Sequence, residues 1–127
     1  MNFNEDFYWH DSVIKNIRIN RDNPGKKDEI EIEIVWYDTE EKVNFVFEDV
    51  YWARMDLIFG FVGKEIILQG YHLPNNDEDL INFYSLWSGL RDGIKLNVYE
   101  ILLNSGGKIK IIAKSFRVVQ PPVGLRL

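Results

Sequence analysis

The sequence predicts an α+β domain that is mainly antiparallel β-sheet, with about six to seven strands and one amphipathic helix packed on the sheet. Three observations predict this class. Apolar and polar residues alternate through several short segments, and turn residues separate those segments. Only one stretch carries its apolar residues at helical spacing. A length of 127 residues favours a single domain, residues 1–127.

The clearest strand is residues 29–37. Side chains on a strand point to opposite faces in turn, so the alternation gives one apolar face and one acidic face. We expect the apolar face to lie on the core and the acidic face, at least at the start of the strand, to lie in water. The apolar face consists of Ile30, Ile32, Ile34 and Trp36, and the acidic face of Glu29, Glu31 and Glu33.

Two further strands complete a predicted meander with residues 29–37. Residues 13–20 form the first strand, with Ile14 on the same face as Asn16, and Ile17 on the opposite face. A polar loop containing a Pro-Gly pair follows at residues 21–28, which predicts a hairpin. Residues 42–48 alternate in the same way and form the third strand. The segment before the meander is rich in aromatic residues, namely Phe3, Phe7, Tyr8 and Trp9, which is not typical of a disordered tail.

Residues 49–63 fit a strand better than a helix, because a helix would gather a weaker apolar stripe. The strand interpretation places Trp52, Arg54 and Asp56 on one face, and Gly60 and Gly63 then mark a bend or bulge. A short strand over residues 64–69 follows, and we expect Gly70 and Pro74 to end it.

The predicted helix covers residues 77–91. Asp77, Glu78 and Asp79 offer caps and negative charge where the helix dipole favours them, while Arg91 and Gly93 suit its end. Apolar residues recur at helical spacing, and we expect this stripe to lie across the sheet. The stripe consists of Leu80, Phe83, Tyr84, Trp87 and Leu90.

Two strands, residues 94–103 and 108–119, should close the chain as a second hairpin. The Gly106-Gly107 pair between them is a strong hairpin signal, and the Pro-Pro pair at residues 121–122 cannot continue a β-ladder.

Composition and charge limit the classes of function. There is no cysteine, the N-terminus is acidic and leads into no long apolar run, and no window resembles a membrane span. We therefore expect a cytoplasmic protein with no membrane contact. The net charge is −5, and most acidic residues lie in the first half of the chain. This balance argues against nucleic-acid binding and would suit a basic protein partner.

The pair His10-Asp11 is the first candidate site, because a carboxylate can orient a histidine that acts as a base. Neighbours on a strand point apart, however, and the metal phosphohydrolases that share a His-Asp pair need more histidines than this chain contains. A structural role is the alternative, in which Asp11 and Ser12 bond nearby backbone N–H groups and start the first strand. We predict no catalytic residue, no metal site and no cofactor.

A second candidate is the face that carries Trp52, Arg54 and Asp56, since protein interfaces favour tryptophan, tyrosine and arginine. The alternative is a satisfied sheet pair that the helix covers. Tyr37, next to the acidic turn, is a further possible contact.

The segment Trp9-His10-Asp11-Ser12-Val13-Ile14, together with the glycine hairpin of residues 98–109, resembles predicted immunity proteins of bacterial toxin systems. The resemblance implies a cytoplasmic binding protein without catalysis, and it supplies no functional residues.

The leading hypothesis is thus a non-enzymatic bacterial cytoplasmic binding protein, for example an immunity-like inhibitor that meets a basic toxin. The first alternative is an enzyme or small-ligand binder with a pocket between helix and sheet, lined by aromatics around Trp52, Tyr84 and Trp87, with His10 and Asp11 at its mouth. The second alternative is a homo-oligomeric protein that associates through an exposed sheet edge.

Overall fold

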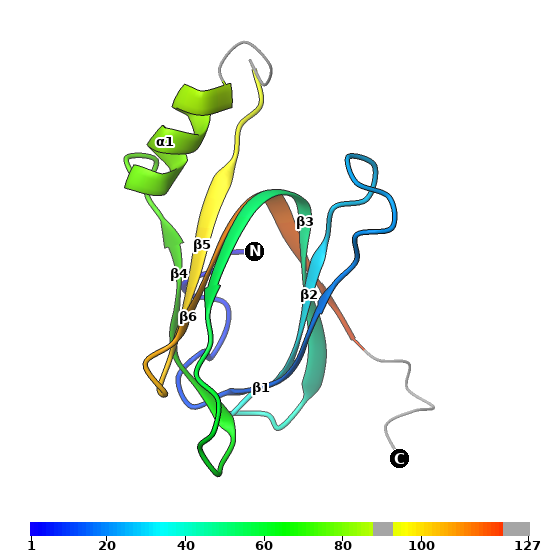
Figure 1. Ribbon diagram of the computed structural model, residues 1–127. Helices are drawn as coiled ribbons and strands as arrows, with labels where there is room; N and C mark the ends of the chain where they lie inside the picture. The colour runs from blue at the N-terminus through cyan, green and yellow to red at the C-terminus, as the bar shows by residue number, and fades with distance from the viewer. Residues whose placement is uncertain (88–92, 121–127) are drawn as a thin grey trace.

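In the computed structural model, which describes residues 1–87 and 93–120, six antiparallel strands form a closed barrel and one helix lies outside it (Figure 1). The strands follow one another around the barrel in the order β1-β2-β3-β6-β5-β4. The mainly antiparallel sheet with a single helix is as predicted, but the closure into a barrel was not predicted. The elements are β1 (Val13–Ile19), β2 (Ile30–Val35), β3 (Lys42–Asp56), β4 (Glu65–Leu73), α1 (Glu78–Trp87), β5 (Asn97–Leu103) and β6 (Lys108–Val119).

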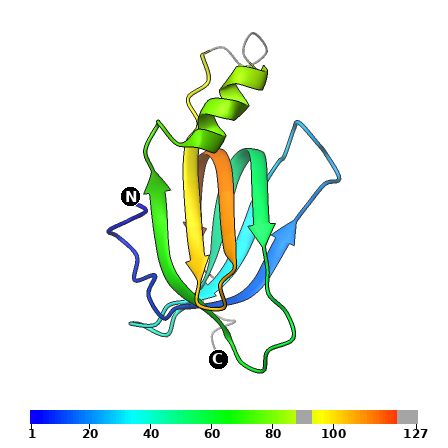
Figure 2. The same ribbon diagram turned by 60° about the vertical axis from the view of Figure 1, so that its left-hand side comes forward.

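The barrel closes through a narrow seam between β1 and β4. Only Val13 and Ile14 of β1 pair with β4, opposite Ile66 and Glu65. The N-terminal segment, residues 1–12, runs beside the rest of β4 (Figure 2). Hydrogen bonds fix it there, for example from the amide of His72 to Asn4 Oδ1 at 2.6 Å. The aromatic N-terminus is therefore part of the barrel wall and core.

Strand β3 corrects the prediction for residues 42–63. The two expected strands are one continuous strand that ends at Asp56, and residues 57–64 form a loop that contains Gly60 and Gly63. Strand β3 arches over the barrel (Figure 1). Its pairing with β6 shifts register between Val50 and Trp52, and the nearby Asp49 has a positive φ of 51°. The choice of strand over helix is correct, but the predicted end is wrong, because the loop glycines release the chain from the sheet.

Strand β1 corrects a second prediction. Its pairing with β2 shifts register between Ile14 and Asn16, so an irregularity lies at Lys15. The extra residue turns Ile14 and Ile17 to the same side, where Ile14 is buried in the core and Ile17 packs against it. Simple alternation had placed these two isoleucines on opposite faces.

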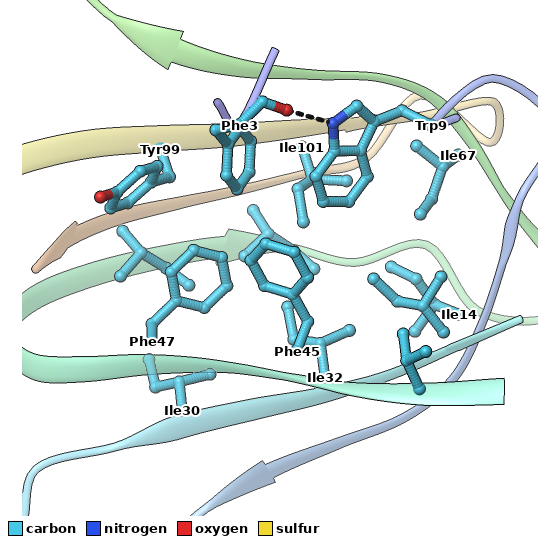
Figure 3. Packing of buried hydrophobic residues seen from close by; sticks show 14 of the residues in the cluster. Phe3, Trp9, Ile14, Ile30, Ile32, Phe45, Phe47, Ile67, Tyr99 and Ile101 are labelled. Carbon is cyan, nitrogen blue, oxygen red and sulfur yellow. Dashed lines mark hydrogen bonds between the residues drawn. The ribbon is translucent and has the colours of Figure 1, made fainter. Parts of the chain in front are cut away.

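Aromatic side chains fill the barrel. The indole N–H of Trp9 donates to the carbonyl oxygen of Phe3 at 2.7 Å, and the Phe3 ring packs on Phe45 and Tyr99 (Figure 3). The buried isoleucines of β2 complete this core, as predicted for Ile30, Ile32 and Ile34. Burial also raises the pKa of Tyr99 to about 12, so its phenol stays neutral at physiological pH.

Gly70 does not end β4, contrary to the prediction, because the strand runs on to Leu73. A glycine is needed here for space. A Cβ atom at position 70 would lie 2.6 Å from two ring carbons of Trp9. The small residue therefore lets the indole lie directly on the strand.

We expect Gly70→Ala to destabilise the fold by about 2 kcal/mol, since a rigid ring and its neighbours must shift to admit the methyl group. Urea denaturation followed by circular dichroism measures the change. Leu68→Ala, on the same strand but exposed, is the control and should cost less. A Gly70→Ala variant as stable as the natural protein would contradict the contact between Trp9 and β4.

Helix α1 covers Glu78–Trp87 of the predicted range 77–91, and residues 88–92, which include Leu90 and Arg91, lie outside the described residues. Its buried residues Leu80 and Phe83 pack on the outer face of the barrel against Val98 and Ile112. Gly93, the first described residue after this gap, has a positive φ of 83°. With ten residues, the one helix in the described part of the chain falls far short of a membrane span.

Candidate functional site

A groove of about 410 Å³ separates α1 from the outer face of β3. Strand β3 supplies three of the lining side chains, Tyr51, Trp52 and Arg54, and α1 supplies the others. We call this surface the Trp52 groove. It is lined by Tyr51, Trp52, Arg54, Asp79, Asn82, Phe83, Leu86 and Trp87.

A buried lysine fixes the helix beside the groove. Lys110 of β6 points outward from the barrel, and its Nζ lies 2.8 Å from Asp77 Oδ1 and 2.6 Å from Asp79 Oδ2. Asp77 also caps the helix, since its Oδ2 accepts the amide of Leu80 at 3.2 Å. This ion triad therefore joins the start of α1 to the sheet beside the groove.

The triad favours the charged forms of Asp79 and Lys110. The hydrogen bond from Lys110 lowers the pKa of Asp79, against the opposing effect of burial. Burial alone would lower the pKa of Lys110, but the hydrogen bonds to Asp77 and Asp79 outweigh it and raise that pKa. The helix attachment is therefore intact through the physiological pH range.

Arg54 is the pairing partner of Lys110 on the neighbouring strand, and its guanidinium lies over the ring of Trp52. Its guanidinium carbon is 5.0 Å from the centre of the indole ring, a cation–π arrangement. Its nearest carboxylate oxygen is Asp79 Oδ2, at 3.8 Å, which is beyond hydrogen-bond distance. Arg54 is thus positioned by stacking, and about half of its side chain is exposed.

The other half of the groove is apolar. Phe83 forms its floor, with ring contacts to Tyr51 at 6.1 Å and to Trp87 at 6.2 Å between centroids. Leu86 is 80% exposed and Trp87 is 43% exposed, both at the end of α1. Large apolar side chains left in water beside an arginine are typical of a surface that binds another molecule.

The structure places the predicted site residues in separate regions. Trp52 and Arg54 lie together in the Trp52 groove, whereas Asp56 lies further along β3, opposite Lys108, and does not line it. Tyr37 is exposed and stacks on Tyr8, with ring centroids 5.9 Å apart.

His10 and Asp11 lie on the surface, away from the groove. The imidazole Nδ1 of His10 is 3.1 Å from the carbonyl oxygen of Leu68, and its Nε2 is 3.6 Å from Asp11 Oδ2. Ser12 has a structural role, but not with the nearby N–H groups that were expected: its buried hydroxyl donates to the carbonyl of Tyr8 and accepts the amide of Tyr37, 25 residues away. Neither His10 nor Asp11 reaches the mouth of the groove, as the pocket hypothesis had expected.

Two of the three aromatic residues expected to line a pocket between helix and sheet do line the groove. Trp52 and Trp87 line the groove, while the hydroxyl of Tyr84 bonds the backbone of Ile94 and Leu96 instead. Neither Lys110 nor the second role of Asp77 and Asp79 was predictable from the local sequence pattern. A lysine on the outer face of a strand looks like an ordinary solvent contact, and only the fold brings it to the helix.

The acidic face of β2 is not a free acidic surface. Glu33 is buried and lies 2.5 Å from Lys42 Nζ, and Glu31 lies 3.3 Å from Arg18. Glu29 lies 3.7 Å from Arg117. The carboxylates that suggested a basic partner are therefore paired with cations of the same chain.

No protein-family model matches the chain, and no curated protein matches it as a relative. Within residues 1–87 and 93–120, no group of three or more His, Asp or Glu side chains is arranged to hold a metal ion.

Proposed function

We propose that this chain is a non-enzymatic protein-binding domain and that it holds its partner in the Trp52 groove. The observation that carries the proposal is the pairing of a stacked Trp52–Arg54 unit with the exposed Leu86 and Trp87 across one groove. Tryptophan and arginine dominate the binding energy of protein interfaces, most of all where apolar neighbours exclude water from them.

The proposal also includes the cellular compartment in which the protein acts. The absence of cysteine and the resemblance of residues 9–14 and 98–109 to predicted immunity proteins support a role in the bacterial cytoplasm, for example as the inhibitor of a toxin. The pairing of Glu29, Glu31 and Glu33 with cations shifts the expected contact away from β2 and to the groove.

Binding of a small ligand is the second candidate, because about 410 Å³ lies within the range of ligand sites, roughly 300–1,000 Å³. The strong exposure of Leu86 favours a protein, since a macromolecular partner can cover the rim of the groove as well as its floor.

Comparative capture tests the proposed function. The natural protein, Trp52→Ala and Leu86→Ser are each used as bait in lysate of the source bacterium, and the bound proteins are quantified by mass spectrometry. We expect a specific partner whose recovery falls at least about tenfold with either variant, the loss typical of an interface hot spot.

Leu68→Ser is the matched control, because Leu68 is also exposed but lies on β4. It should capture the partner as the natural protein does. If every specifically bound protein is retained by both groove variants, the groove is not the binding surface. Light scattering on the same samples would show self-association, and a homo-oligomer that both groove variants preserve would favour the sheet-edge alternative.

A further inference from the structure

Arg54 has unused hydrogen-bonding capacity. A guanidinium carries five N–H donors in its plane, and stacking on an indole occupies the face of that plane and leaves its edge free. Within the described part of the chain, the guanidinium of Arg54 donates no hydrogen bond, and its one ion-pair contact is the 3.8 Å approach to Asp79. The donors at the edge of the guanidinium are therefore available to a bound molecule.

Asp79 does not accept a hydrogen bond from the guanidinium donors of Arg54. The oxygen nearest to Arg54 is Asp79 Oδ2, which already accepts a hydrogen bond from Lys110 at 2.6 Å. Because Lys110 is joined to Asp77 as well, the triad is a closed unit beneath the groove. Arg54 is left at the rim, over the ring of Trp52, and it attracts Asp79 without a hydrogen bond to it.

The group that fits this edge is a carboxylate. Its two oxygens match the planar donor fork of arginine, and no other common side chain of a protein offers two anionic acceptors in one plane. Next to Arg54 the groove is lined by Trp52, Phe83, Leu86 and Trp87, which suit an apolar side chain. The amide of Asn82 lies in the same lining and can bond the backbone of a bound segment.

We propose that the Trp52 groove recognises a segment of the partner in which an aspartate or glutamate stands next to a large apolar residue. The carboxylate binds Arg54, and the apolar side chain packs between Trp52 and Trp87. This inference rests on the proposed function and narrows it, because it expects a locally acidic contact in place of the basic partner that net charge suggested.

The test uses three short peptides with blocked ends, Gly-Ser-Phe-Glu-Ser-Gly and its versions with glutamine or lysine in place of glutamate. Each peptide is titrated into the ¹⁵N-labelled full chain and followed by NMR. The four tryptophans give four indole N–H signals. Those of Trp52 and Trp87 report on the groove, and those of the buried Trp9 and Trp36 serve as internal controls.

We expect the glutamate peptide to shift the signals of Trp52 and Trp87 and to bind about tenfold more tightly than the glutamine peptide, as a charge-assisted hydrogen bond allows. The lysine peptide should bind most weakly. Arg54→Gln should remove the preference for glutamate. Lys64→Gln, which makes the same charge change in the loop after β3, should retain it.

Equal binding of the three peptides, or tightest binding of the lysine peptide, would overturn the inference while leaving the groove as a binding surface. A preference for glutamate that survives Arg54→Gln would overturn the role of Arg54. Signals of Trp52 and Trp87 that stay unchanged with all three peptides would also overturn the inference. The proposed function fails separately, when the groove variants retain every captured protein.

Discussion

Trp9→Ala is expected to destabilise the protein by about 4 kcal/mol, the largest effect of any substitution considered for this chain. Trp9 is 1% exposed and contacts Phe3, Phe7, Trp36 and Phe45. Alanine leaves a large cavity and removes the hydrogen bond to the Phe3 carbonyl. It also loosens the N-terminal segment that completes the seam between β1 and β4.

Urea denaturation followed by circular dichroism measures this loss. Trp87→Ala removes the same side chain from the partly exposed end of α1 and should cost less than about 1 kcal/mol. If the two alanine variants were equally stable, Trp9 would not be a core residue and the N-terminal segment would not belong to the barrel.

Lys110→Met is expected to cost about 3 kcal/mol, because it leaves Asp77 and Asp79 beside the sheet without their cation. The loss should fall mainly on α1, and thermal unfolding with far-ultraviolet detection can follow the helix signal. Lys108→Met is the matched control. Lys108 lies on the same strand and the same outward face, opposite Asp56, and should change stability by about 0.5 kcal/mol or less.

The difference in stability between the natural protein and Lys110→Met should also depend on pH. The pKa of Asp79 is lowered by folding, so its contribution is present above 3.8, its ordinary value, and is lost as the pH falls through the folded pKa. The pKa of Lys110 is raised, so its contribution is present below 10.5 and is lost as the pH rises through the folded pKa. The stability gap between the natural protein and Lys110→Met should therefore be constant from about pH 5 to 9 and shrink in acid. A gap that is widest in acid would contradict the ion triad.

Local patterns predicted the strands and the helix, because burial on one face imposes a period of 2 or 3.6 on the sequence itself. The alternation of Ile30, Ile32 and Ile34 is the clearest case. The pattern failed where one residue is inserted, at Lys15 in β1 and at Tyr51 in β3, since a bulge reverses the faces without changing composition. The prediction that Gly70 ends a strand was wrong for a related reason. A glycine is needed there because the Trp9 ring, which is distant in sequence, lies against it.

In the candidate site, too, local features could be predicted from the sequence and long-range contacts could not. Trp52 and Arg54 were predictable as a pair, because they stand two residues apart on one strand. The attachment of α1 by Lys110 was not, since it joins positions 31 and 33 residues apart. Barrel closure is likewise a long-range property, and two residue pairs between β1 and β4 leave little trace in the sequence.

The central claim is that a protein partner lies against the Trp52 groove. Photocrosslinking in the cells that produce this protein tests it most directly. The photoreactive residue p-benzoylphenylalanine replaces Leu86 in one variant and Leu68 in another, both exposed positions. We predict that irradiation joins a discrete partner to the chain through position 86 and not through position 68. Crosslinking of that partner through position 68 alone would contradict the account.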